Sequence, residues 1–195
     1  MHTHLYVGRL GSFASFVAYW LDWPSVAYFF QHYTWGWPLC ETLHFIGLCL
    51  LVGIVGMFDL RVLGIVKGLP LAPLQRLLRW AVFGFVLCVI TGGMFVMGIG
   101  ANLIGEYPYD ILMTDTWLQL KLIFMFLAGA NVLAFYLTGA ARAVDALGPE
   151  DNALPLAKVI AGTSLFLWLG VVYFGRLIPW DLDLITSGPL GILAP

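Results

Sequence analysis

The residues of this sequence best suited to chemistry are a glutamate, a histidine and a glycine spaced three apart in an apolar stretch. Glu41 and His44 would lie about 60° apart on one helix face, which Gly47 continues. Imidazole is a common ligand of haem iron, and its second ring nitrogen needs an acceptor that orients the ring. The pattern predicts a haem b iron held by His44, with Glu41 as the acceptor and Gly47 leaving room for the porphyrin. A histidine hydrogen-bonded within a helix bundle is the structural alternative.

Further polar or soft side chains fall at the same depth in the other apolar stretches. At about 1.5 Å per residue along a helix, His44 lies roughly 9 Å below Pro38, where its stretch begins. Lys121 lies roughly 8 Å below Thr116, where another stretch begins. These depths predict one site in the outer part of a membrane, made of Glu41, His44, Gly47, Met94, Met97, Lys121 and Arg176.

The predicted roles of these residues follow from the needs of a haem. The apolar stretches contain no second histidine, so the sixth position on iron would be empty, filled by Met94 or Met97, or supplied by another chain. Lys121 and Arg176 are the predicted partners of the haem propionates. Simpler interpretations stay open, in which the methionines fill helix packing, the two cations snorkel to the surface, or Lys121 pairs with Glu41.

The composition requires a membrane to surround these stretches. Hydrophobic residues make up 61% of the 195 residues and charged residues 10%, and the formal net charge is −2. A soluble domain is nearer about half apolar and a quarter charged. The chain also lacks the basic excess of a nucleic-acid-binding protein. The predicted fold class is therefore an all-α integral membrane protein whose first partner is the lipid bilayer.

Four stretches are long enough to cross the hydrocarbon layer, which takes about 20 residues of helix. The predicted spans are residues 38–58, 78–98, 116–138 and 156–178, which form a four-transmembrane-helix bundle over residues 38–178. Asn131, in the middle of the third span, is expected to tie helices together through its amide. Glycines within the spans are expected to let the helices approach closely.

The segments outside these spans carry two further predictions. Residues 10–33 are interrupted by Asp22 and Pro24, which favours an interfacial amphipathic helix over a fifth span. Residues 1–37 are thus predicted to be a segment on the periplasmic side of the membrane. Residues 179–195 are predicted to be a periplasmic tail.

The orientation follows from the positions of the basic residues. The loop after the first span is rich in Lys and Arg, and the region between the third and fourth spans carries more of them, whereas residues 100–115 have none. By the positive-inside rule, the basic loops face the cytoplasm and both termini lie outside. The predicted location is a bacterial inner membrane. The basic residues are Arg61, Lys67, Arg76, Arg79, Arg142 and Lys158.

Several other chemistries find no support in the sequence. The three cysteines lie in apolar stretches without a CxxC or CxxCH pattern, so neither a disulfide scaffold nor covalent haem is expected. No removable signal peptide is expected at the N-terminus. No nucleophile–base pair or P-loop occurs, so no enzyme class is predicted. His2 and His4 suggest copper binding only as a further alternative.

Two motifs of the first span also resemble a known group of proteins. The run from Trp35 to Leu48 and the sequence Asp59-Leu60-Arg61-Val62-Leu63-Gly64 resemble an uncharacterised family of small bacterial four-span inner-membrane proteins. The shared pattern is aromatic-Pro-x-x-Glu-x-x-His-x-x-Gly followed by DLRxLG. Thr91-Gly92, and Lys121 with Asn131, are similar as well, so the resemblance covers about residues 20–138. It implies the four-span topology and no particular activity.

A fainter resemblance extends to two kinds of four-span protein, through His44 and Lys121. These are the membrane protoporphyrinogen oxidase of haem synthesis and the copper-resistance membrane proteins. The chain lacks the additional histidines of a cytochrome with two bis-histidine haems.

Three functions are therefore predicted. The first is a haem b protein with a redox or haem-linked role near the periplasmic face. The second is an accessory subunit of a larger respiratory or photosynthetic membrane complex, or of a homo-oligomer. The third is copper handling.

Overall fold

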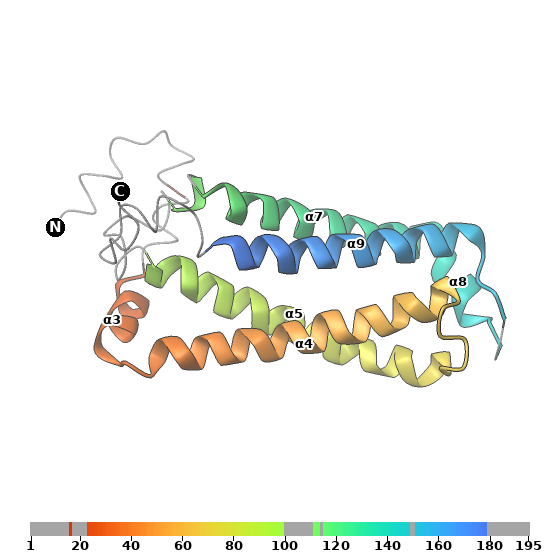
Figure 1. Ribbon diagram of the computed structural model, residues 1–195, viewed down its shortest axis with the longest axis horizontal. Coiled ribbons are helices and arrows are strands. Elements are labelled where there is room, and N and C mark those ends of the chain that lie inside the picture. The colour runs from red at the N-terminus through yellow and green to blue at the C-terminus, as the bar shows by residue number, and fades with distance from the viewer. Residues whose placement is uncertain (1–15, 17–22, 100–110, 114, 149–150, 179–195) are drawn as a thin grey trace, which may run out of the picture.

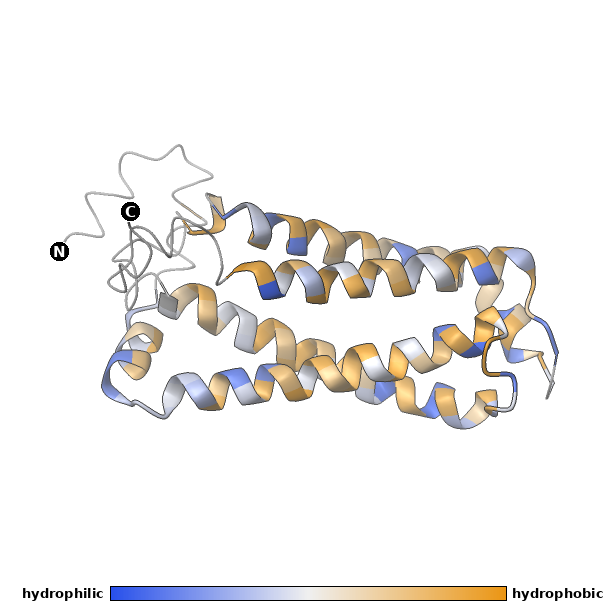
Figure 2. Ribbon diagram, viewed as in Figure 1, coloured by the Kyte–Doolittle hydropathy of each residue, from blue (hydrophilic) through white to orange (hydrophobic). Residues whose placement is uncertain are grey.

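A computed structural model describes residues 16, 23–99, 111–113, 115–148 and 151–178, whose regular structure is helical throughout (Figure 1). Four helices are long and apolar enough to cross a membrane, and apolar residues predominate along them (Figure 2). They are α4 (Gly36–Leu63), α5 (Leu71–Ile99), α7 (Thr116–Leu137) and α9 (Pro155–Leu177). The two short helices are α3 (Pro24–His32) and α8 (Ala140–Asp145). The protein is thus an all-helical multi-pass membrane protein, as predicted.

The spanning helices are arranged as two pairs. Helix α4 packs on α5, α7 packs on α9, and the pairs meet where α4 packs on α9. The described residues of α5 and α7 make no comparably extensive contact. Helix α3 lies at one end of the bundle and α8 at the other (Figure 1), and these are called the α3 end and the α8 end below.

Two helix boundaries differ from the predicted spans. Helix α4 continues past residue 58 to Leu63, because Asp59 and Arg61 are buried within the protein instead of lying in a solvated loop. It ends at Gly64, whose φ of +86° allows its N–H to bond the carbonyl of Arg61. Helix α5 begins at Leu71 and not at 78. Pro73 does not break it, since a first-turn residue needs no N–H for the helix.

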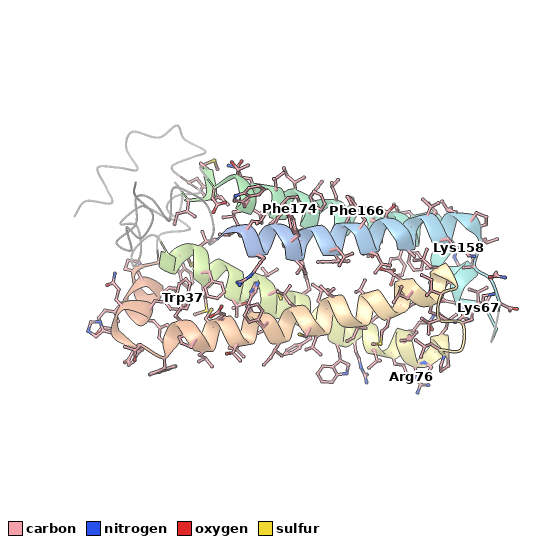
Figure 3. The ribbon with its side chains drawn as sticks, in the orientation of Figure 1. Trp37, Lys67, Arg76, Lys158, Phe166 and Phe174 are labelled. Carbon is pink, nitrogen blue, oxygen red and sulfur yellow. The ribbon has the colours of Figure 1, made fainter. Side chains whose placement is uncertain are left out.

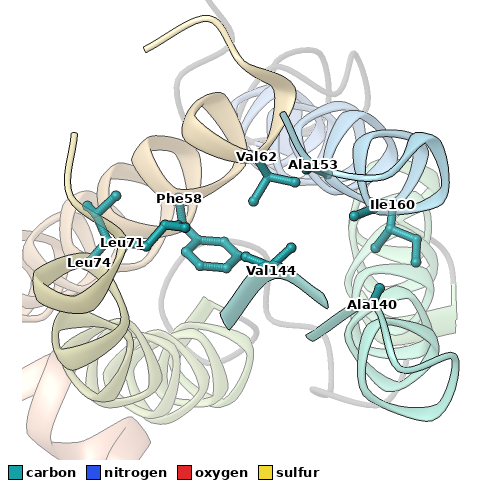
Figure 4. Packing of buried hydrophobic residues seen from close by; sticks show 10 residues of the cluster. Phe58, Val62, Leu71, Leu74, Ala140, Val144, Ala153 and Ile160 are labelled. Carbon is teal, nitrogen blue, oxygen red and sulfur yellow. The ribbon is translucent and has the colours of Figure 1, made fainter. Parts of the chain in front are cut away.

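The buried apolar residues form two clusters, one in the middle of the bundle and one near its α8 end. The cluster near the α8 end joins α4, α5, α8 and α9 and is shown in Figure 4. The second cluster includes Leu51 and Ile54 of α4 with Trp168 and Val171 of α9. Nearer the α3 end, the buried residues of α4 are Gly36, Cys40, His44 and Gly47. The buried polar residues of α4 therefore lie near both of its ends, with His44 towards the α3 end and Asp59 and Arg61 towards the α8 end.

Helices α4 and α5 cross at a pair of glycines. A methyl group on Gly47 would lie 2.8 Å from the carbonyl oxygen of Gly84, and one on Gly84 would lie 2.6 Å from the carbonyl oxygen of Gly47. Side chains at these two positions would force the backbones apart. This crossing confirms the expectation that span glycines serve close helix packing.

Helix α3 covers the end of α5. The buried ring of Phe30 lies against Gly98. A helix of 9 residues is about 13 Å long, so α3 itself is too short to span a bilayer. Most of the predicted interfacial helix, and both predicted periplasmic termini, lie outside the described residues.

At the opposite end, Arg61 ties two loops to α4. Its side chain is 1% exposed. The guanidinium group donates hydrogen bonds to the carbonyl oxygens of Leu69, Gly148 and Asp151. The loop after α4 and the segment before α9 are thereby joined.

Candidate functional site

His44 is held at the α4–α5 interface by the hydroxyl group of Thr91. The imidazole is 9% exposed, and its Nδ1 lies 2.8 Å from Oγ1 of Thr91. That hydroxyl donates to the carbonyl oxygen of Leu87 at 2.7 Å, which engages its one proton. Thr91 must then accept the hydrogen bond from His44, so Nδ1 carries the proton. In the neutral ring, Nε2 is left with a free lone pair.

The surroundings of His44 fix its orientation further. The thiol of Cys88 donates to the carbonyl oxygen of His44 at 3.5 Å, and that of Cys40 donates to the carbonyl oxygen of Thr91 at 3.6 Å. The ring of Phe95 packs edge-on against the imidazole, with 5.6 Å between ring centroids. Thr91 and Phe95 of α5 thus contact the imidazole, and the two thiols join the backbones of α4 and α5 beside it.

Lys121 approaches this site from the other helix pair. Its Nζ lies 3.2 Å from where a methyl group on Gly175 of α9 would stand, so the side chain lies between α7 and α9. The ammonium group also acts electrostatically on His44 and on Cys88. The structure therefore brings His44 and Lys121 towards each other across the two pairs.

Glu41 and Gly47 do not have the surroundings that the sequence predicted for them. Glu41 is exposed, and Thr91 takes the position at Nδ1 of His44 that Glu41 was predicted to fill. Gly47 faces α5, where Gly84 and Cys88 occupy the space beside it. A porphyrin therefore cannot lie against Gly47 as predicted, because the helix crossing fills that face of α4.

The remaining predicted residues lie on three helices. Met94 and Met97 are half-buried on α5, and Arg176 is exposed in the last turn of α9. The amide of Asn131 donates to the carbonyl oxygen of Ile160 at 3.1 Å, which confirms that it ties α7 to α9. His2 and His4, the residues of the copper prediction, lie outside the described residues.

His44 is a single donor and not part of a cluster. Within the part of the chain that the structure describes, no three His, Cys, Asp or Glu side chains come together as a metal-binding group. One imidazole with a fixed tautomer suits a metal whose other ligands come from elsewhere, as in a haem.

Sequence reasoning missed Thr91 as the partner of His44. Thr91-Gly92 is only a further similarity to the family, and this is the signal that could have pointed to the position. The structure gives Thr91 a reason, and it places Gly92 beside the same ring, where a methyl group would make an ordinary contact, 3.6 Å from Cε1 of His44.

Comparisons of the chain with protein-family models, with curated proteins and with solved structures find no match. The family resemblance stays a prediction.

Proposed function

We propose that the protein binds haem b near the α3 end of the bundle, with Nε2 of His44 as an axial ligand of the iron. The observation that carries the proposal is the hydrogen bond from Nδ1 to Thr91. It assigns the proton to the nitrogen facing Thr91 and leaves Nε2 as a donor of fixed orientation. This is the usual arrangement of a histidine that binds a metal, whose other nitrogen is held by a protein acceptor.

The packing of α5 on α4 excludes a haem from one side of His44. The face of α4 at Gly47 is filled by α5, so the haem would lie towards α7 and α9. Lys121 would there meet a propionate, and Arg176, exposed at the same end, would meet the other. The remaining position on the iron would be filled by Met94 or Met97, supplied by another chain, or left open. A bound haem would supply one-electron transfer or the binding of a small ligand.

The proposal includes an orientation in a bacterial inner membrane. Lys67, Arg76 and Lys158 lie at the α8 end, away from Trp37 at the α3 end (Figure 3). Basic residues favour the cytoplasmic side. With the α8 end in the cytoplasm, the His44 site lies near the periplasmic face.

Haem titration of the purified protein tests this proposal. We expect the wild-type chain to bind haem with a sharp Soret band, and His44→Ala to bind at least about tenfold more weakly. The matched control is His32→Ala, since His32 is exposed on α3. Equal binding by all three proteins would overturn the assignment of His44.

A second function, an accessory subunit, is favoured by the exposure of α7. In the apolar 18-residue stretch of α7 that would cross the membrane, only 6% is buried within the protein. The corresponding share is 39% in α4 and in α9. Such a helix has a wide face for lipid, for another subunit or for a second copy of the chain. A stable monomer without a co-purifying partner from native membranes would count against this function.

A further inference from the structure

A cavity of about 330 Å³ lies between the four spanning helices. It is separate from the His44 site, because its lining begins at Leu51 on α4 and extends to Val62. Most of its lining is apolar. The polar residues in the lining, apart from Tyr136 at its edge, are Asp59, Asn131, Ser164 and Trp168.

Two polar atoms of this lining are buried without a hydrogen-bond partner. They are Oδ2 of Asp59 and Nε1 of Trp168. Asp59 is 4% exposed and Trp168 is 7% exposed. An unpaired buried polar group is costly, and native proteins rarely keep one without a reason. Two in one cavity indicate a ligand that supplies the missing partners.

The neighbouring polar residues do not provide a hydrogen-bond partner for Oδ2 of Asp59. Ser164 lines the same cavity, and Oδ2 of Asp59 is left unpaired. Arg61 lies two residues further along α4, but its guanidinium group donates to loop carbonyl groups. Asn131 donates its amide to the backbone of α9. Among the described residues, Oδ2 of Asp59 therefore has no partner, although its side chain lines the cavity.

The cavity reaches the surface beside α5 and α7. Val82 of α5 and Val132 and Tyr136 of α7 line it, and all three are exposed. The described residues of these two helices make no extensive contact that would close this side. In a membrane this side faces the acyl chains, so a lipid-soluble molecule can enter from the bilayer.

We propose that this cavity binds a lipid-soluble ring compound with hydroxyl or carbonyl oxygens, of the quinol and quinone class. In the quinol form, a hydroxyl group of the ligand donates to Oδ2 of Asp59, and an oxygen accepts from Nε1 of Trp168; the quinone form offers only the acceptor. Phe58, Phe85 and Phe135 line the cavity and suit a flat ring. The volume is at the lower end of the range for small-molecule pockets, about 300–1,000 Å³.

Amines and fatty-acid carboxylates satisfy fewer of these atoms. An amine would pair with Asp59 but offer no acceptor to the Trp168 N–H once protonated. A fatty-acid carboxylate would accept from Trp168 but would repel an ionised Asp59. The quinol class supplies both a donor and an acceptor. The proposal does not depend on haem binding at His44.

Equilibrium binding of decylubiquinol and of decylubiquinone, to the full chain in nanodiscs of quinone-free synthetic lipid, tests the proposal. We expect saturable binding of at least one form at one site per chain. Asp59→Asn should weaken it about tenfold and Trp168→Phe about fivefold, since each removes one hydrogen-bonding group. A ring-bearing secondary amine serves as the competing probe.

A matched pair of glycine variants keeps the test independent of these polar residues. A methyl group on Gly129, in the lining, or on Gly53, outside it, meets no atom within 4 Å. Gly129→Phe should therefore abolish binding by filling the cavity, and Gly53→Phe should leave it unchanged. Thermal unfolding of both variants checks that each is folded.

Three results would overturn the proposal. They are the absence of saturable binding to the wild-type chain, equal binding by Gly129→Phe and Gly53→Phe, and stronger binding of the amine than of either quinone form. The first would mean that water or lipid alone fills the cavity. If Asp59→Asn does not fold, the glycine pair decides the outcome.

Discussion

Thr91 is the residue on which the proposed chemistry of His44 depends. Its hydroxyl can accept from Nδ1 of the imidazole because its own proton is engaged by the carbonyl oxygen of Leu87. A side chain without an oxygen at this position would leave the tautomer of His44 free and Nδ1 unpaired. Residue 91 therefore positions the ligand without touching the iron.

The hydroxyl can be tested by two substitutions of nearly equal size. We expect Thr91→Val to weaken haem binding about tenfold, and Thr91→Ser to keep it within a few-fold of wild type. The measurement is the Soret titration, with the width and position of the band as a readout of axial ligation. A band that is the same in all three proteins would show that Thr91 does not orient the ligand.

Arg61 and Asp59 are two buried ionisable side chains of α4 that differ in their hydrogen-bond partners. Arg61 is satisfied by three carbonyl oxygens of the chain itself. Asp59 keeps one oxygen unpaired beside a cavity. The first arrangement is typical of a structural tie, whereas the second is typical of a binding group.

The structural role of Arg61 makes a stability prediction. We expect Arg61→Met to lower the free energy of unfolding by about 3 kcal/mol, because it leaves buried carbonyl groups without donors. The exposed Arg76 is the control, and Arg76→Met should change stability by less than about 0.5 kcal/mol. Unfolding in mixed micelles measures both. Equal stability of the two variants would contradict the role of Arg61.

At the scale of helices, the α4–α5 pair depends on the crossing of Gly47 and Gly84. Neither position has room for even a methyl group, since that group would lie 2.6–2.8 Å from the carbonyl oxygen of the other glycine. The crossing also sets the rotation of the two helices, which brings Thr91 to His44.

The crossing predicts different effects for two glycine substitutions. We expect Gly84→Ala to lower the free energy of unfolding by about 1–3 kcal/mol, because the helices must move apart. Gly53→Ala, where the new methyl group meets nothing, should not destabilise the protein. Unfolding of both variants under one set of conditions checks this. Similar stability of Gly84→Ala and Gly53→Ala would show that the helices do not depend on this crossing.

The four spans could be predicted because hydropathy and length are local properties of the chain. The ends of α4 and α5 could not, since Asp59 and Arg61 look like loop residues until their burial is known. The pairing of His44 with Thr91 depends on how α4 and α5 rotate against each other. A single sequence does not contain that rotation. The cavity at Asp59 depends in turn on the placement of all four helices.

At the scale of the whole molecule, the two candidate sites lie at different positions along the bundle axis. The polar site at His44 and Lys121 lies towards the α3 end, and the cavity at Asp59 lies towards the α8 end. Val171, an apolar core residue outside the cavity lining, lies between them on α9. In the proposed orientation, one site lies near each face of the membrane.

Cysteine labelling in whole cells tests this orientation. Two positions outside the spanning helices are suitable. Thr34 is exposed near the α3 end, and Lys67 is half-buried near the α8 end. We expect a membrane-impermeant maleimide to label Thr34→Cys in intact cells and Lys67→Cys only after permeabilisation. The wild-type chain gives the background from its own cysteines. The opposite labelling would reverse the orientation and place His44 near the cytoplasm.

The absorption spectrum of the protein purified from its native membrane tests the central claim most directly. We expect haem b in the wild-type protein, with a Soret band that is lost in His44→Ala and kept in His32→Ala. A wild-type protein without haem, or a band that survives His44→Ala unchanged, would contradict the account.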